Sequence, residues 1–116
     1  MAQNYDITID QGATFSFAFT WKDSNGDRVD LTGYSAKMQI REYYSSSTPV
    51  LELSTMDGSI TLGGTSGVVT VTASDEATRD IAIDSGVYDL ELYSPLGTTK
   101  RLIQGKVAIS PEVTRD

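Results

Sequence analysis

Residues 84–93 read DSGVYDLELY, and the fold expected for this chain is organised around them. From residue 87 onward the side chains alternate between two sides of the chain. Tyr88, Leu90 and Leu92 fall on one side, and Val87, Asp89, Glu91 and Tyr93 fall on the other. Alternation with a period of two is typical of a strand with two unlike faces. The polar run SDEATRD at residues 74–80 precedes this strand and predicts a short helical turn.

A helical turn followed by Asp84-x-Gly86-x-Tyr88 and a strand is the layout of the tyrosine corner in immunoglobulin-like sandwiches. In that corner a Tyr near the start of the strand bonds back to the main chain upstream. Antibody domains place a core cysteine two residues after the Tyr, where this chain has Leu90, whose aliphatic side chain fills the same volume. The alternative is a generic strand entered through a glycine turn. Both interpretations make Tyr88 and Leu90 structural residues.

The composition indicates one domain, residues 1–116, with a core of its own. A domain of this size buries somewhat over ~60% of the surface that its unfolded chain exposes, so its core does not need disulfides or a metal for stability. The chain has no cysteine and no histidine. Disulfides, thiol nucleophiles and thiolate metal sites are therefore excluded, as are the usual general base and the commonest transition-metal ligand. We expect no catalytic residue, no cofactor and no metal site.

The formal net charge of −7 argues against a nucleic-acid partner, because phosphates would be repelled. No apolar run is long enough for a membrane span, and the N-terminal residues MAQNYD are polar, unlike a signal peptide. The chain is therefore expected to be made and used in a cytosol-like compartment, or to be exported only as part of something larger.

The clearest alternation in the chain lies in residues 13–22, ATFSFAFTWK. All of its large aromatic side chains fall on one face: Phe15, Phe17, Phe19 and Trp21. Each aromatic side chain can remove ~150–250 Å² from water, so this row is predicted to be the main contribution to the core. A stacking platform for bases or sugars is the alternative, but an exposed stripe of aromatics would invite aggregation.

Further alternating segments complete an all-β pattern. They lie at residues 5–10, 35–43, 50–54, 59–62, 68–72 and 99–110, separated by Gly-, Asn- and Pro-containing turns. Gly105 in the last of them suggests a bulge. Seven to eight short strands and one short helical turn predict a single immunoglobulin-like antiparallel β-sandwich. Residues 1–4 and 111–116 are expected to be short terminal arms.

Two loops have a possible binding role. Asp23-Ser24-Asn25-Gly26-Asp27 resembles the start of a calcium loop, but Arg28 replaces its glycine and Tyr34 its final Glu. We interpret it as a hairpin turn. Residues 44–49, YSSSTP, form a polar loop that is either surface disorder or a segment ordered by a partner.

Paired carboxylates offer the one route to catalysis that the composition leaves. Asp89 and Glu91 share a strand face, so their side chains are expected to lie roughly 7 Å apart, as in strands and within the range of glycosidases. Charged residues are, however, routine on a solvated strand face, and nothing in the sequence marks a cleft. We expect the protein not to be an enzyme.

Three long segments carry a family resemblance: YDITIDQGATFSFAFTWKDSNG (5–26), VDLTGYSAKMQIRE (29–42) and GVYDLELYSPLGTTKRLIQGKVAISPEVTR (86–115). Together they resemble a family of small tailed-bacteriophage virion proteins, distantly similar to the N-terminal domain of the phage baseplate upper protein. In that protein the domain docks onto the tail and a later fibre segment binds the receptor. The resemblance implies a β-sandwich virion protein, assembled in the host cytoplasm, that serves as the docking part, an adaptor or a decoration.

Two functions remain in competition. The first is a structural module of the tail or baseplate, or a capsid decoration or neck protein, which binds other virion proteins and copies of itself. Its terminal arms would add strands to neighbours. The second is a carbohydrate-binding sandwich at the host surface, with tyrosines as sugar platforms. The candidate interface residues are Tyr43, Tyr44, Tyr93, Glu112, Val113 and Arg115. A sugar site requires the tyrosines to converge on one concave surface, whereas docking spreads its contacts.

Overall fold

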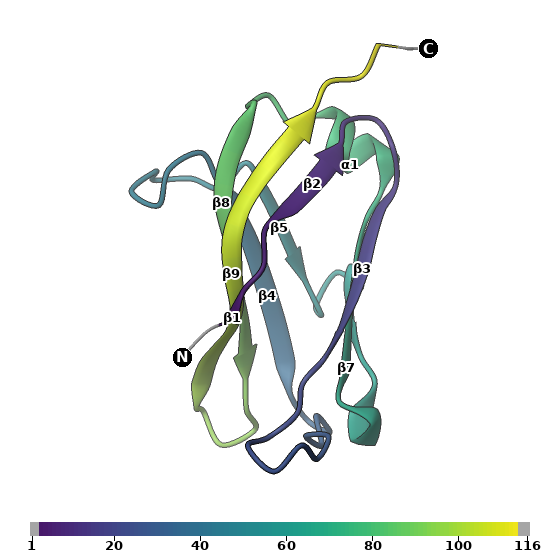
Figure 1. Cartoon of the computed structure of the whole chain (residues 1–116), viewed down its shortest axis with the longest axis vertical. Helices are drawn as coiled ribbons and strands as arrows, with labels where there is room; N and C mark the ends of the chain where they lie inside the picture. Colours follow the sequence, from purple (N-terminus) through teal and green to yellow (C-terminus); the bar gives the residue numbers. More distant parts are fainter. Residues whose placement is uncertain (1–2, 114–116) are drawn as a thin grey trace.

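The computed structural model describes residues 3–113 and confirms the all-β sandwich (Figure 1). Within these described residues, nine strands form two sheets. They are β1 (Gln3–Asn4), β2 (Ile7–Asp10), β3 (Phe15–Thr20), β4 (Ser35–Arg41), β5 (Leu51–Ser54), β6 (Ile60–Leu62), β7 (Val68–Ala73), β8 (Ser85–Tyr93) and β9 (Thr99–Ser110). One α-helical turn, α1 (Asp75–Arg79), and one 3-10 turn, Gly64–Ser66, lie between strands. No helix within residues 3–113 is both long and apolar enough to cross a membrane.

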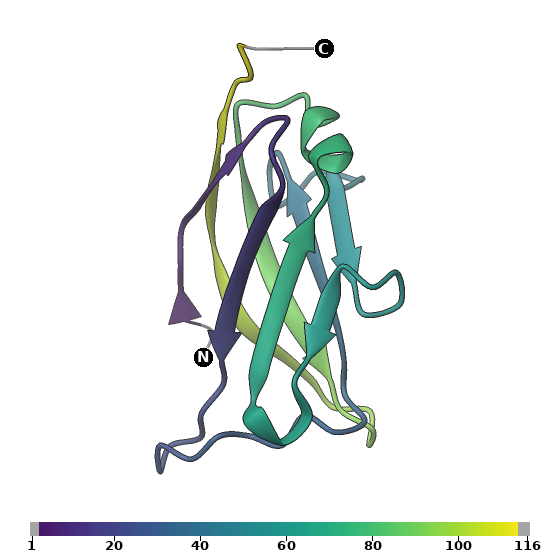
Figure 2. The ribbon, with the colours of Figure 1, turned by 90° about the vertical axis from the view of Figure 1, so that its right-hand side faces the viewer.

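The strand order is that of an immunoglobulin-like sandwich. The larger sheet has the order β1-β9-β8-β4-β5, with β2 also pairing with β9, and the smaller sheet has the order β3-β7-β6. Figure 2 shows the smaller sheet in front of the larger one. In immunoglobulin terms β3, β7 and β6 occupy the B, E and D positions, and β4, β8 and β9 occupy C, F and G, with β5 as an added edge strand.

Most neighbouring strands pair antiparallel, as predicted, but the N-terminal strands do not. Both β1 and β2 run parallel to β9. Gly105 of β9 lies between the residues that pair with β1 and those that pair with β2, and a Cβ there would collide with the carbonyl oxygen of Tyr5. The bulge predicted at Gly105 is therefore wrong. The register of β8 and β9 instead shifts between Leu90 and Glu91, opposite Leu102.

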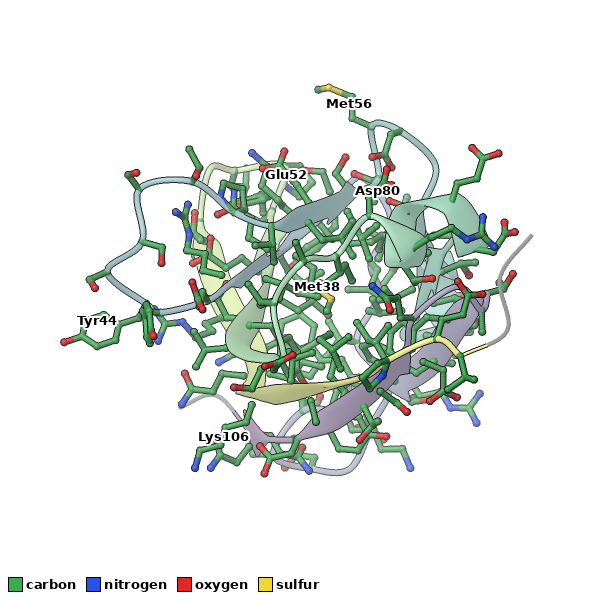
Figure 3. All side chains as sticks on the ribbon, turned by 90° about the horizontal axis from the view of Figure 1, so that it is seen from above. Met38, Tyr44, Glu52, Met56, Asp80 and Lys106 are labelled. Atoms are coloured by element: carbon green, nitrogen blue, oxygen red, sulfur yellow. The ribbon has the colours of Figure 1, made fainter. Side chains whose placement is uncertain are left out.

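The core is aliphatic and lies under the centre of the larger sheet. Leu90, Ile103 and Val71 are fully buried, and Met38 lies between the two sheets (Figure 3). Tyr88 is also buried, at 4% exposure, so the prediction that Tyr88 and Leu90 are core residues is confirmed.

The aromatic row points inward, as predicted, but it is not the main part of the core. Phe15, Phe17, Phe19 and Trp21 are only partly buried against the aliphatic cluster. The reason is position: β3 is an edge strand, so one side of the row has no neighbouring strand to cover it. Phe17 instead contacts Phe15 and Tyr5, with ring centroids 5.6 and 6.0 Å apart, and Trp21 contacts Tyr34 with centroids 6.3 Å apart.

The tyrosine corner differs from the prediction in its acceptor. The Tyr88 hydroxyl donates to the main-chain carbonyl of Tyr5, at the opposite end of the sequence, rather than to the segment just upstream. This bond holds the N-terminal segment against β8 and β9. The helical turn before the corner is confirmed, and its buried Thr78 donates from its hydroxyl to the carbonyl of Ala13 at 2.8 Å.

The described parts of the predicted terminal arms are bound to the sandwich. Gln3 and Asn4 form β1, and the main-chain N–H of Glu112 donates to the side chain of Gln11 at 3.0 Å. The Glu112 carboxylate also lies 3.4 Å from the Arg79 guanidinium. Residues 3–4 and 112 of the expected arms are thus bonded to the sandwich, and Arg115 lies outside the described residues.

Candidate functional site

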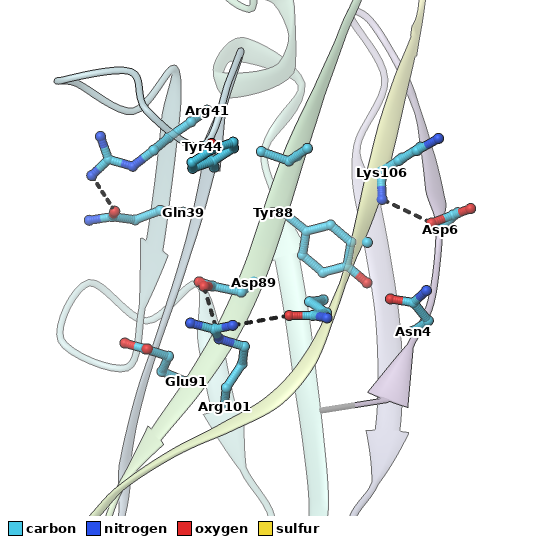
Figure 4. Close-up of a pocket in the computed structure, with 13 residues that line it drawn as sticks. Asn4, Asp6, Gln39, Arg41, Tyr44, Tyr88, Asp89, Glu91, Arg101 and Lys106 are labelled. Atoms are coloured by element: carbon cyan, nitrogen blue, oxygen red, sulfur yellow. Dashed lines mark hydrogen bonds and ion pairs between the residues drawn. The ribbon is translucent and has the colours of Figure 1, made fainter. Parts of the chain in front are cut away.

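The outer face of the larger sheet holds a hollow of about 870 Å³ (Figure 4). Its floor is built from outward-facing positions of β4, β8 and β9, and the N-terminal segment closes one side. The lining residues are Asn4, Asp6, Gln39, Arg41, Tyr44, Val87, Tyr88, Asp89, Glu91, Arg101, Gln104, Gly105 and Lys106. The hollow is therefore predominantly polar and charged.

Strand register brings the floor residues together. Gln39 of β4 pairs with Asp89 of β8, which pairs with Gln104 of β9, so their side chains form one row across the sheet. In each strand these positions alternate with buried apolar residues. The hollow thus follows directly from the two-residue period of three adjacent strands.

Most polar side chains of the floor are engaged with one another. Arg101 lies 3.4 Å from the Asp89 carboxylate and donates to the Gln104 side chain at 3.1 Å. On the other side, Arg41 donates to the side-chain oxygen of Gln39 at 2.8 Å, and Gln39 donates to the Glu52 carboxylate at 2.6 Å. No buried side-chain polar atom within residues 3–113 lacks a partner.

The acidic pair lies on one face of β8, as predicted. Burial raises the pKa of Asp89, and the neighbouring Glu91 carboxylate adds to this, while Arg101 and Arg41 oppose it. The Glu91 carboxylate accepts a hydrogen bond from the Tyr93 hydroxyl at 3.0 Å. Burial and this bond to Glu91 raise the pKa of Tyr93 to about 12. Both carboxylates therefore already have partners within the sheet.

Tyr44 forms the rim of the hollow. It extends from the loop after β4 and is 90% exposed (Figure 3). The loop is held at its base, because Arg41 donates to the carbonyl of Ser46 at 2.6 Å and the main-chain N–H of Tyr43 donates to the Ser46 hydroxyl at 3.1 Å. An exposed aromatic ring therefore lies beside amide, guanidinium and carboxylate groups, which can donate and accept hydrogen bonds.

The candidate interface residues do not gather in one place. Of the three tyrosines only Tyr44 lines the hollow. Tyr43 is 64% exposed outside it, and Tyr93 is partly buried further along β8. At the C-terminal end Val113 is 89% exposed, whereas Glu112 is bonded to Arg79. The convergence that a sugar site of three tyrosines requires is not observed.

Sequence reasoning missed most of the floor. Gln39, Arg41, Gln104 and Arg101 were outward-facing polar positions of single strands, with nothing to show that they were neighbours. The signal lay in pairing rather than composition, because it needed the register of β4, β8 and β9.

Residues 23–27, which resemble the start of a calcium loop, form a turn whose hydrogen bonds are made within the turn. The Asp23 carboxylate accepts from the main-chain N–H groups of Asn25 and Asp27, at 2.9 and 3.0 Å. Within the part of the chain that the structure describes, no group of three acidic side chains is arranged to hold a metal ion.

The outer face of the smaller sheet has the opposite character. Its outward positions in β3, β7 and β6 are all small and uncharged: Ser16, Ala18, Thr20, Thr61, Val68, Thr70 and Thr72. Charged residues make up 22% of the chain, yet none occupies an outward position of these three strands. Figure 2 shows no element of residues 3–113 in front of it.

Comparison with known proteins gives no further guide to the site. No protein-family model matches the chain, and no curated protein matches it.

Proposed function

We propose that the chain is a non-enzymatic structural component of a tailed-phage virion, a docking or adaptor module of the tail or baseplate that acts through protein–protein contacts. The proposal rests on the family resemblance of the segments 5–26, 29–42 and 86–115 together with the two-sheet sandwich. It is supported by a hollow whose acidic pair is already bonded to neighbouring side chains.

The observation that carries the docking role is the charge-free outer face of the smaller sheet. Charged residues are depleted at the centres of protein interfaces, because their desolvation is costly. In a chain with a net charge of −7, this face is where a neighbour can approach without meeting carboxylates. It is also uncovered and built on regular strands, so a partner meets a rigid surface.

A charge placed on this face tests the proposal. In the Thr70→Lys variant a lysine stands at the centre of the charge-free face, and in the control Thr8→Lys the same change is made at an exposed position of β2. We expect both to fold, and particles assembled with Thr70→Lys to contain at least ten-fold less of the chain than those with Thr8→Lys. Mass spectrometry of purified particles gives the amount. Absence of the wild-type chain from particles would overturn the virion role, and equal incorporation of both variants would overturn the role of the face.

Sugar binding at the hollow is a second candidate, which the position of Tyr44 favours. The two adjacent tyrosines provide a matched pair, because Tyr44 lines the hollow and Tyr43 does not. If the hollow binds glycans, Tyr44→Ala should lose at least ten-fold in affinity on a glycan array while Tyr43→Ala keeps wild-type binding. Equal loss in both variants, or no glycan bound by the wild type, would remove this candidate.

A further inference from the structure

The outer edge of β3 carries main-chain groups that no other strand takes up. The N–H of Trp21 donates to the carbonyl of Gly67 at 2.8 Å, which fixes the phase of the ladder between β3 and β7. Because bonded and unbonded positions alternate in an antiparallel pair, the N–H and C=O groups of Ser16, Ala18 and Thr20 point away from β7. Within residues 3–113 no strand is hydrogen-bonded to β3 on that side.

This edge is a position that an immunoglobulin-like sandwich normally fills. In that fold strand A pairs with strand B in the smaller sheet. Here the N-terminal strands β1 and β2 pair instead with β9 in the larger sheet. The vacancy beside β3 explains why the inward-facing aromatic row is only partly buried and why Tyr5, against Phe17, is 48% exposed.

The edge also lacks the usual protection against pairing. Natural sheets guard exposed edges with charged residues, prolines, bulges or very short strands. Residues 13–21, ATFSFAFTW, contain no charge and no proline, and β3 is a regular strand of six residues. Such an edge is a template for another strand.

We propose that β3 pairs antiparallel with β3 of a second copy of this chain, across a two-fold axis at Ala18. This register joins the unpaired main-chain groups of Ser16, Ala18 and Thr20 to those of Thr20, Ala18 and Ser16 of the copy. It fuses the two smaller sheets into one of six strands. The inference goes beyond the virion role, because it needs only the chain itself.

The side chains of β3 suit this pairing. On the inner face the register places Phe17 opposite Phe19 and Phe15 opposite Trp21 of the copy, and such aromatic pairs stabilise neighbouring strands. On the outer face it places Ala18 opposite Ala18, so the smallest side chain of the strand lies at the axis. No like charges meet, although each copy carries a net charge of −7. The charge-free outer faces of both copies become continuous.

The area that the two copies would bury at β3 is small, so their association is expected to be weak. Only part of each aromatic ring is exposed, so the buried area falls below the roughly 800 Å² per partner of a standard interface. We therefore expect a dimer that forms at high protein concentration and dissociates on dilution.

A single cysteine tests the register, since the wild-type chain has none. In a hydrogen-bonded antiparallel pair such as Ala18 with Ala18 the Cβ atoms lie near the upper end of the range of about 4.5–5.5 Å, too far for an unstrained disulfide but within reach of a short bis-maleimide. A bis-maleimide should therefore join two copies of Ala18→Cys into a covalent dimer. Ala108→Cys is the matched control, an exposed alanine on β9 of the other sheet. We expect at least ten-fold more cross-linked dimer from Ala18→Cys than from Ala108→Cys on denaturing gels.

A second variant separates pairing from random collision. Adding Ser16→Pro to Ala18→Cys removes one edge donor without removing a bond to β7, so cross-linking should fall to the level of the control. Circular dichroism establishes that the double variant is folded, and if it is not, the two single-cysteine chains still decide the result. Equal cross-linking of those two would overturn the proposal. Cross-linking of Ala18→Cys only to a different protein in purified particles would overturn it too, and would leave the virion role standing.

Discussion

The two sheets of the sandwich differ in how their edges are paired and in what their outer faces carry. The larger sheet is completed along β9 by the parallel strands β1 and β2, and its outer face carries interlocked charges around a hollow. The smaller sheet has an open edge at β3 and an outer face without charge. The larger sheet therefore has partners within the chain for the β9 edge and for the polar side chains of its outer face, whereas the smaller one leaves the β3 edge and a face for something outside it.

The two sheets also differ in how much their inward-facing side chains contribute to stability. Aliphatic residues at the centre of the larger sheet are fully buried, while the aromatic row on β3 is partly exposed despite its size. Buried area rather than side-chain volume determines the hydrophobic contribution. The centre of the larger sheet is thus expected to respond to mutation more strongly than the aromatic edge.

Truncating one side chain at the centre of the larger sheet and one in the aromatic row should give the largest change in the free energy of unfolding. Leu90→Ala removes a fully buried side chain from β8 and should lower the free energy of unfolding by about 3–4 kcal/mol, because it leaves a cavity. Phe17→Ala removes a larger but partly exposed ring, and should cost about 2 kcal/mol, less than a fully buried Phe. Urea unfolding at low protein concentration measures both. A greater loss for Phe17→Ala would show that the aromatic row is the centre of the core after all.

Removing one hydroxyl from each of two tyrosines of β8 gives the next effect. Tyr88→Phe leaves the Tyr5 carbonyl without its partner beneath the N-terminal segment, and should cost about 1–2 kcal/mol. Tyr93→Phe is the control, because its partner Glu91 lies on the outer face where water replaces the bond, so the loss should stay below about 1 kcal/mol.

Hydrogen exchange sharpens the same comparison. In Tyr88→Phe the main-chain N–H of Tyr5, which donates to Gln104, should exchange faster. In Tyr93→Phe its exchange should be unchanged. Unaltered exchange in both variants would mean that the hydroxyl of Tyr88 does not hold the N-terminal segment.

The sequence predicted what depends on alternation within single strands, and failed where strands from distant segments meet. The strand at 85–93, the helical turn before it and the inward direction of the aromatic row all follow from local period. The acceptor of Tyr88 does not, because it required knowing that Tyr5 lies across β9. The partial burial of Phe17 required the sheet order, which puts β3 at an edge.

The candidate site shows the same limit. Asp89 and Glu91 were found together because they lie two residues apart in one strand. Their neighbours in the hollow were not, because Gln39 and Gln104 come from other strands and meet Asp89 only through register. Tyr44 was named as an interface residue, but its position at the rim depends on how Arg41 holds the loop.

The smallest expected effect contrasts a carboxylate in the hollow with one in a turn. Burial and Glu91 raise the pKa of Asp89, so its charged form is less favourable in the folded chain than in the unfolded one. Its stabilising contribution is therefore lost as the pH rises through the window between the ordinary value of 3.8 and the raised folded value. The Asp57 pKa is instead lowered, first by the Ser59 hydroxyl and then by the Ser59 main-chain N–H, and its contribution is lost as the pH falls below 3.8.

Two isosteric substitutions test these opposite pKa shifts through the pH dependence of stability. Asp89→Asn should match or exceed the wild type in stability at pH 7, by under about 1 kcal/mol given the exposed partner Arg101, and the difference should vanish near pH 3. Asp57→Asn should be less stable than the wild type at pH 7 and approach it near pH 3. Urea unfolding of both variants across this range gives the two slopes. If Asp89→Asn instead destabilises the chain at pH 7, the pairing of Asp89 with Arg101 outweighs its burial, and the hollow is held together by that ion pair.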